Sequence, residues 1–124
     1  MSETPLRVLF AIGVNQNFFD LPESGIGEVW VAFSGFLDAL RDTDGIEVLA
    51  DIDDDAHQVG PSTGWPWTAY IIADVVDQPT VRAAVGLLRT ITVGDGTHRL
   101  WRYIKIEARM GRPLTVRPEV QLPG

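Results

Sequence analysis

The chain has 124 residues, no cysteine and a formal net charge of −7. This length favours one domain, which we expect to have an ordered core over about 6–110 and an extended arm over 111–124. The acidic balance argues against nucleic acid or an anionic membrane as a partner bound by charge, and the lack of cysteine excludes disulfides and thiol catalysis. No apolar run could span a bilayer and the start lacks a basic signal-peptide region, so a cytoplasmic location is expected.

The first half of the chain alternates between strand and helix patterns. Residues 6–14 predict a strand buried on both sides, and residues 15–22 a loop. A helix is expected from about Glu23 or Gly25 to Leu40, because apolar residues recur at three- and four-residue steps: Ile26, Val29, Trp30, Phe33, Leu37 and Leu40. After the turn at 42–45, a second strand is expected over 46–52, with one side formed by Ile46, Val48, Ala50 and Ile52.

The second half begins with a long irregular stretch over 53–66, a length typical of binding loops or lids. A third strand is expected at about 67–75, followed by a helix that starts around Pro79 and carries an apolar stripe as far as Ile91. The sequence Gly94-Asp95-Gly96 ends that helix, and a fourth strand is expected over 100–108.

The order βαββαβ predicts an α+β, ferredoxin-like fold of the dimeric α/β-barrel type. It has a four-stranded antiparallel sheet with 6–14 and 67–75 at its centre and two helices on one face. The residues expected to face the helices are all apolar: Val8, Phe10, Ile12, Val48, Ala50, Ala69, Ile71, Ala73, Ile104 and Ile106. The open face is expected to carry Leu9, Ala11, Gly13, Leu49, Asp51, Thr68, Tyr70, Ile72, Trp101, Tyr103, Lys105 and Glu107. Large apolar side chains on that face favour a homodimer formed sheet against sheet.

The small residues Ala11 and Gly13 predict a hollow on the open face, bordered by Tyr70 and Tyr103; simple accommodation of bulky neighbours explains them equally well. We expect strands 6–14 and 67–75 to run parallel, which places the polar candidates in two separate groups. Asn15, Asn17, His98, Trp101 and Arg102 then gather at one end of the sheet, and the 53–66 loop with His57, Trp65 and Trp67 lies at the other. At ~3.3 Å per residue, those ends are more than about 20 Å apart.

The acidic run around Asp53 gives no metal site. The EF-hand pattern that starts at Asp51 has Ala56 and Ser62 where glycine and glutamate are needed, so a solvated strand end is the better interpretation. His57 is a candidate general base, although a surface histidine without a role is commoner. The aromatic loop over 60–67 is either a rigid cap on the core or a lid that stacks a planar ligand.

Four stretches of the chain, 7–20, 53–55, 59–68 and 101–111, resemble the IacB family of small proteins from bacterial indole-3-acetate degradation clusters. The resemblance spans most of the chain. It implies a dimeric α/β-barrel relative that processes an oxidised indole-acetate intermediate, and it implies no particular catalytic residue. Proteins of neighbouring families include cofactor-independent oxygenases, isomerases and ring-opening enzymes, so the fold does not fix the reaction.

We therefore expect an enzyme of aromatic catabolism that binds a small aromatic carboxylate and uses no cofactor or metal. The candidate catalytic residues are His57 as general base, Asn17 and Tyr70. The candidate substrate-binding residues are Asn15, Trp65, Trp67, Trp101, Arg102 and Tyr103, with Arg102 on the carboxylate and the aromatic side chains on the ring. A non-catalytic binding or accessory subunit of a partner oxygenase, and a structural dimer without a ligand, remain alternatives.

Overall fold

The structure is a computed structural model that describes residues 5–54 and 67–114. The helices are α1 (Gln16–Phe19), α2 (Glu23–Asp42) and α3 (Gln78–Gly86), with 3-10 turns η1 (Leu87–Arg89) and η2 (Leu100–Arg102). The strands are β1 (Leu6–Val14), β2 (Ile46–Asp53), β3 (Ala69–Val75), β4 (Thr92–Val93), β5 (His98–Arg99) and β6 (Ile104–Gly111).

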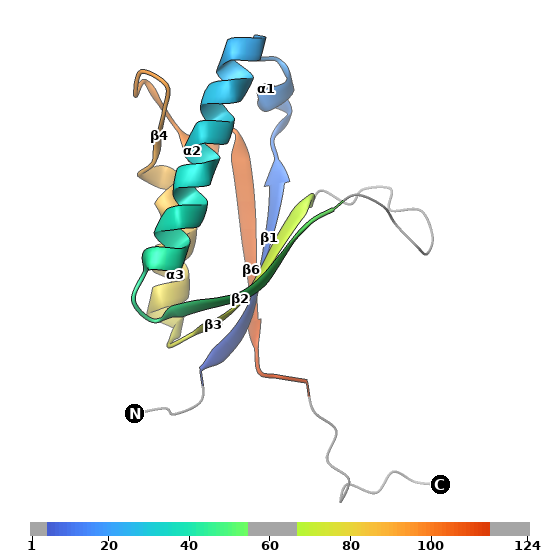
Figure 1. The fold of residues 1–124 in the computed structure, drawn as a ribbon, viewed down its shortest axis with the longest axis vertical. Coiled ribbons are helices and arrows are strands. Elements are labelled where there is room, and N and C mark those ends of the chain that lie inside the picture. Colours follow the sequence, from blue (N-terminus) through green and yellow to red (C-terminus); the bar gives the residue numbers. More distant parts are fainter. Residues whose placement is uncertain (1–4, 55–66, 115–124) are drawn as a thin grey trace, which may run out of the picture.

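Four strands form one antiparallel sheet in the order β2-β3-β1-β6, which confirms the α+β class and the central position of β1 and β3. The helices α2 and α3 lie on one side of this sheet (Figure 1). The order of elements departs from a plain βαββαβ chain. The short helix α1 occupies the stretch expected to be a loop, and η1, the β4–β5 hairpin and η2 stand between α3 and β6.

The core lies between the sheet and the helices. The side chains of Val8, Phe10 and Ile12 alternate along β1 toward the helices and are at most 2% exposed. On α2 the fully covered row is Val29, Ala32, Phe36 and Leu40, so the buried face is rotated from the predicted stripe. Trp30, which the periodicity placed in the core, is 49% exposed at the margin of that row.

The prediction that β1 and β3 run parallel was wrong. Each strand–helix–strand connection returns to a parallel strand two positions away, so the strand between must be antiparallel to both. Ile12 of β1 accordingly pairs with Ala69 of β3, and Asp53 of β2 pairs with the same Ala69. Val14 pairs with Ile104 at the start of β6. The stems of the 53–66 stretch therefore lie at the same end of the sheet as Asn15, not about 20 Å away.

A β-bulge at Leu49 reverses the side-chain alternation in the outer half of β2. Val48 pairs with Ala73, but Ala50 pairs with Ile72, so one residue is extra on β2. The register then places Ala50 on the open face and Asp51, opposite buried Ile71, on the helix side. Both residues were predicted on the opposite faces. The bulge also turns Ile52, which is 60% exposed, away from the helices.

The predicted strand over 100–108 begins four residues late, at Ile104. A strand alternating from Leu100 would bury Arg102 beside it, which is costly for an unpaired cation. The 3-10 turn η2 instead buries Leu100 (0% exposed) and Tyr103 (5% exposed) and leaves Trp101 and Arg102 outside. Tyr103 is thus a core residue, not an open-face residue as expected.

The helix α3 begins as predicted and ends earlier. The Asp77 carboxylate caps it by accepting hydrogen bonds from Thr80 N at 2.9 Å and Thr80 Oγ1 at 2.6 Å. These bonds lower the pKa of Asp77. The apolar stripe toward Ile91 continues as the 3-10 turn η1, which buries Leu88.

Candidate functional site

A groove of about 700 Å³ lies at the β6 edge of the sheet, beside η1, η2 and the end of β1. We call it the basic groove. Its lining residues are Asn15, Asn17, Val85, Leu88, Arg89, Thr97, His98, Arg99, Trp101, Arg102, Ile104, Lys105 and Ile106. Four of the predicted site residues, Asn15, Asn17, Trp101 and Arg102, therefore line a single groove.

The groove is lined by four cationic side chains, Arg89, Arg99, Arg102 and Lys105, and by no Asp or Glu among the residues that the structure describes. This is notable in a chain with 17 acidic and 10 basic residues. Elsewhere in the described residues, Arg7, Arg41 and Arg109 each form an ion pair with an acid. The groove cations form none with a described residue, so they produce a local positive potential that attracts anions.

Asn15 holds the turn that presents Trp101 and Arg102. Its backbone N–H donates to Tyr103 O at 2.7 Å, and its Nδ2 donates to Arg102 O at 3.1 Å and to Trp101 O at 3.5 Å. Because Nδ2 is engaged with the backbone, we assign Asn15 a positioning role in place of the expected hydrogen bond to the ligand. With Leu100 and Tyr103 anchored in the core, Trp101 is 57% exposed at the groove.

Asn17 lines the groove because Phe18, the next residue along α1, fixes this short helix against the core. Phe18 is 5% exposed and packs edge-on against Trp30 of α2, with ring centroids 5.4 Å apart. Asn17 Oδ1 is shielded from solvent and has no hydrogen-bond partner among the described residues. A buried acceptor without a donor is costly, and a ligand with an N–H or O–H group could satisfy it.

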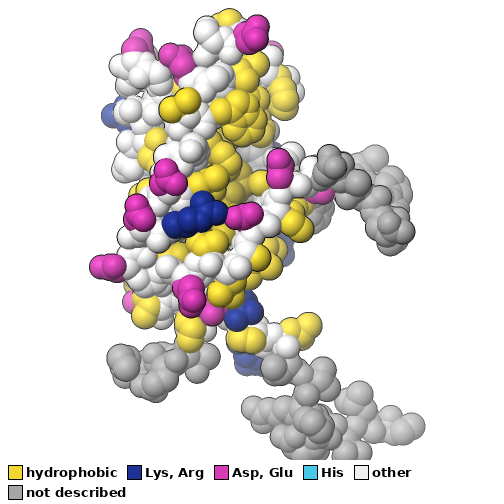
Figure 2. Space-filling view, in the orientation of Figure 1, with side chains coloured by type: hydrophobic (Ala, Val, Ile, Leu, Met, Phe, Trp, Pro, Cys, Tyr) yellow, Lys and Arg dark blue, Asp and Glu magenta, His cyan; other side chains and the backbone are white. Residues whose placement is uncertain are grey.

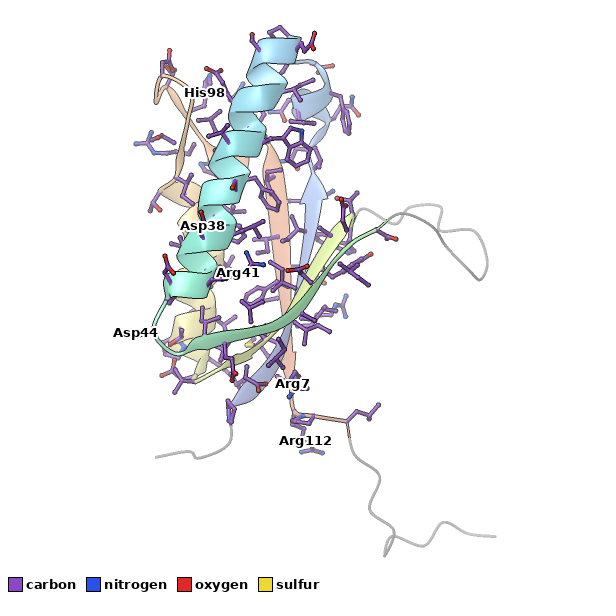
Figure 3. All side chains as sticks on the ribbon, in the orientation of Figure 1. Arg7, Asp38, Arg41, Asp44, His98 and Arg112 are labelled. Atoms are coloured by element: carbon purple, nitrogen blue, oxygen red, sulfur yellow. The ribbon has the colours of Figure 1, made fainter. Side chains whose placement is uncertain are left out.

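His98 lies on the short strand β5, which forms a hairpin with β4 in the upper part of the view in Figure 3. Its ring packs edge-on against Tyr103, with centroids 6.4 Å apart and planes at 87°. Asp95 in the preceding turn accepts a hydrogen bond from Thr97 N at 2.9 Å, which lowers the pKa of Asp95, and the nearby His98 acts in the same direction. His98 supplies the groove with an imidazole, the side-chain type that enzymes use most often for general acid–base catalysis.

The other predicted site residues lie around the groove or elsewhere. Trp67 is half-buried, and the Lys105 Nζ lies 5.7 Å from its ring centroid, so Trp67 is joined to the groove through one of its cations. Tyr70 lies on the open face opposite Ala11 and donates to Asp54 Oδ2 at 3.1 Å; it does not line the groove. His57 and Trp65 lie outside the described residues.

Ala11 and Gly13, above which a hollow was expected, are both buried, and neither lines the groove. The register confirms that they share the open face with Tyr70 and Lys105.

The sequence suggested that the cations over 99–109 could together hold a carboxylate, although pairing with the abundant acids was the safer expectation. The groove contains three of them, Arg99, Arg102 and Lys105, whereas Arg109 pairs with Glu107. Arg89 and Thr97 were missed, because η1 and the β4–β5 hairpin that carry them were not predicted. The available signal was the excess of cations over 99–109 in an otherwise acidic chain. Such clustering in the sequence indicates an anion site only once the topology places the cations on one surface.

Comparisons with known proteins add no name to this site. No protein-family model, no curated protein and no solved structure matches the chain. Within 5–54 and 67–114, no group of three or more His, Asp or Glu side chains is arranged to hold a metal ion. No helix in the same ranges is long and apolar enough to cross a membrane.

Proposed function

We propose that the basic groove binds a small aromatic carboxylate of the indole-3-acetate type. The observation that carries this proposal is the gathering of four cations, none in an ion pair with a described residue, around one exposed tryptophan. An arginine guanidinium matches the two oxygens of a carboxylate, and Arg102 is adjacent to Trp101, whose ring can stack on a planar ligand. A groove of about 700 Å³ is large enough for a bicyclic ring with a short acid side chain.

The polar groups beside the cations favour an indole or an oxidised indole. Such a ring carries an N–H donor, and Asn17 Oδ1 is a shielded acceptor that no described residue satisfies. The anion would lie toward Arg102 and Lys105 while the ring N–H points to Asn17. This arrangement agrees with the resemblance of the sequence to the IacB family.

We propose processing of an oxidised indole-acetate intermediate without a cofactor as the activity. His98, which lines the groove, is a second candidate for the proton-transfer residue beside His57. Asn17 would orient the substrate, and Asn15 would act only by holding η2.

A non-catalytic binding or accessory subunit of a partner oxygenase is the alternative. The observation that favours it is the open character of the groove, in which Trp101 remains 57% exposed. Catalytic pockets usually exclude water so that their electrostatic interactions are strengthened. Binding without turnover would be the signature of this alternative.

We further propose a homodimer with ferredoxin-like protomers of the dimeric α/β-barrel type. Its support is the central position of β1 and β3 in an antiparallel sheet, together with exposed apolar side chains on the open face. Ile52 is 60% and Ile72 is 39% exposed there, and a second copy would cover both.

The test of binding is calorimetric titration with indole-3-acetate and with 2-oxindole-3-acetate. Arg102→Gln should weaken binding about tenfold, the loss of one charge-assisted hydrogen bond. The matched control Arg82→Gln removes the same charge from the exposed side of α3 and should leave the affinity unchanged. Equal loss in both variants, or no binding of either acid, would refute the proposal.

The test of catalysis is incubation of the same acids with the protein, followed by chromatography of the products. Turnover that falls on His98→Gln while the dissociation constant stays within about twofold supports the enzyme. Binding without any product supports the accessory subunit.

A further inference from the structure

A second cavity, of about 250 Å³, opens on the other side of the molecule, between α2 and the outer halves of β2 and β3. We call it the aromatic cleft. Figure 2 shows hydrophobic side chains exposed in a band between α2 and β2, crossed by one basic side chain. The outer ends of β2 and β3 curve away from α2 there, as the ribbon in Figure 1 shows.

One wall of the cleft comes from α2. Trp30, Phe33 and Leu37 line it at steps of three and four residues, and they share one side of the helix. This is the row that the sequence periodicity assigned to the core. The Trp30 and Phe33 rings pack edge-on, with centroids 6.0 Å apart, so the wall is preformed and aromatic.

The opposite wall carries two carboxylates because of the bulge at Leu49. Asp51 and Asp53 both line the cleft, and the register places both on the helix side of β2. Bulges commonly re-aim side chains next to functional sites. Without the extra residue, Ala50 and Ile52 would lie on the helix side of β2 in place of the two carboxylates.

The charge at the mouth is unbalanced. Arg41 Nη2 lies 2.8 Å from Asp51 Oδ2, and Figure 3 shows Arg41 reaching from α2 toward β2. No ion pair joins Asp53 to a described residue, so within the described part of the chain one negative charge beside the cleft has no balancing cation. Trp30 and Phe33 line the same cleft, and the faces of aromatic rings attract positive charge.

We infer that the aromatic cleft binds a small aromatic ammonium ion, with its ring against Phe33 and Leu37 and its ammonium group at Asp53. This ligand has the opposite charge to that proposed for the basic groove, and the two sites share only Ile104 among their lining residues. The inference does not depend on the function proposed for the groove. The chain would then bind an acid and an amine at separate places.

The experiment uses 2-phenylethylammonium as the probe and 2-phenylethanol as its neutral analogue. Binding is followed in the whole chain by the nuclear magnetic resonance shift of the Trp30 indole N–H, assigned with Trp30→Phe. The ammonium should bind at least fivefold more tightly than the alcohol. Equal affinity, or no shift of the Trp30 signal, would overturn the inference.

Two variants at the mouth should act in opposite directions. Asp53→Asn should weaken ammonium binding about fivefold or more, whereas Arg41→Gln should strengthen it because Asp51 loses its partner. Asp44→Asn removes the same charge from a turn residue outside the cleft and should change the affinity less than twofold. Since general misfolding cannot strengthen binding, weaker binding in Arg41→Gln, or unchanged binding in Asp53→Asn, would contradict the proposed site.

Discussion

The 3-10 turn η2 determines which residues of 100–103 lie in the core and which line the groove. The free energy of unfolding of single variants tests this assignment. Leu100 is 0% exposed and Trp101 is 57% exposed. Truncating a fully buried leucine to alanine costs about 2–5 kcal/mol in lost transfer energy and cavity formation. Trp101→Ala should cost under about 1 kcal/mol, because much of that side chain already contacts water.

For a chain of this size, 1 kcal/mol corresponds to roughly 3–5 °C in Tm, so Leu100→Ala should lower Tm by about 10 °C or more. Urea and thermal unfolding followed by circular dichroism measure both variants, and Arg102→Ala should resemble Trp101→Ala. If the segment were instead a regular strand, Leu100 and Arg102 would share one face. A loss for Trp101→Ala or Arg102→Ala as large as for Leu100→Ala would refute the assignment of the turn.

Three further predictions concern the cap of α3, the turn before β2 and the open face of the sheet. The hydrogen bonds from Thr80 lower the folded pKa of Asp77, so its stabilisation is complete above the ordinary value of 3.8 and is lost as pH falls through the lower folded pKa. A pH series of Tm should therefore show a smaller acid fall in Asp77→Ala than in the wild type, and an equal fall would contradict this role. Gly45→Ala should lower Tm, because φ is +90° and a Cβ would lie 2.7 Å from Val76 Cγ1; Val76→Ala should recover only the steric part. Ile72→Asp should convert a dimer to a monomer in analytical ultracentrifugation with little change in Tm, and an unchanged sedimentation coefficient would count against the open-face dimer.

The sheet and its core could be predicted from the sequence because they depend on alternation. Val8, Phe10 and Ile12 were assigned to the helix side by parity alone, and all three are buried. The position of β1 and β3 at the centre followed from the order of elements. The order of elements also requires β1 and β3 to be antiparallel, and the parallel arrangement that was predicted placed the 53–66 stretch at the wrong end of the sheet.

The departures from the expected fold are local events that periodicity does not record. The bulge adds a single residue, Leu49, and reverses the faces of Ala50 and Asp51. The turn η2 replaces alternation because Arg102 cannot share the core with Leu100. Both departures supply site residues: Asp51 and Asp53 at the cleft, and Trp101 and Arg102 at the groove.

The most direct test of the basic groove is a nuclear magnetic resonance titration of the whole chain with indole-3-acetate at low salt. We predict shifts of the Trp101 indole N–H, the Asn17 side-chain amide and the His98 ring, and no shift of the Trp30 indole N–H. Added salt should weaken these shifts, since the cations of an open groove are screened over about 10 Å at 0.1 M. Shifts confined to the Trp30 side of the molecule, or none at Trp101 and Asn17, would contradict the proposed site.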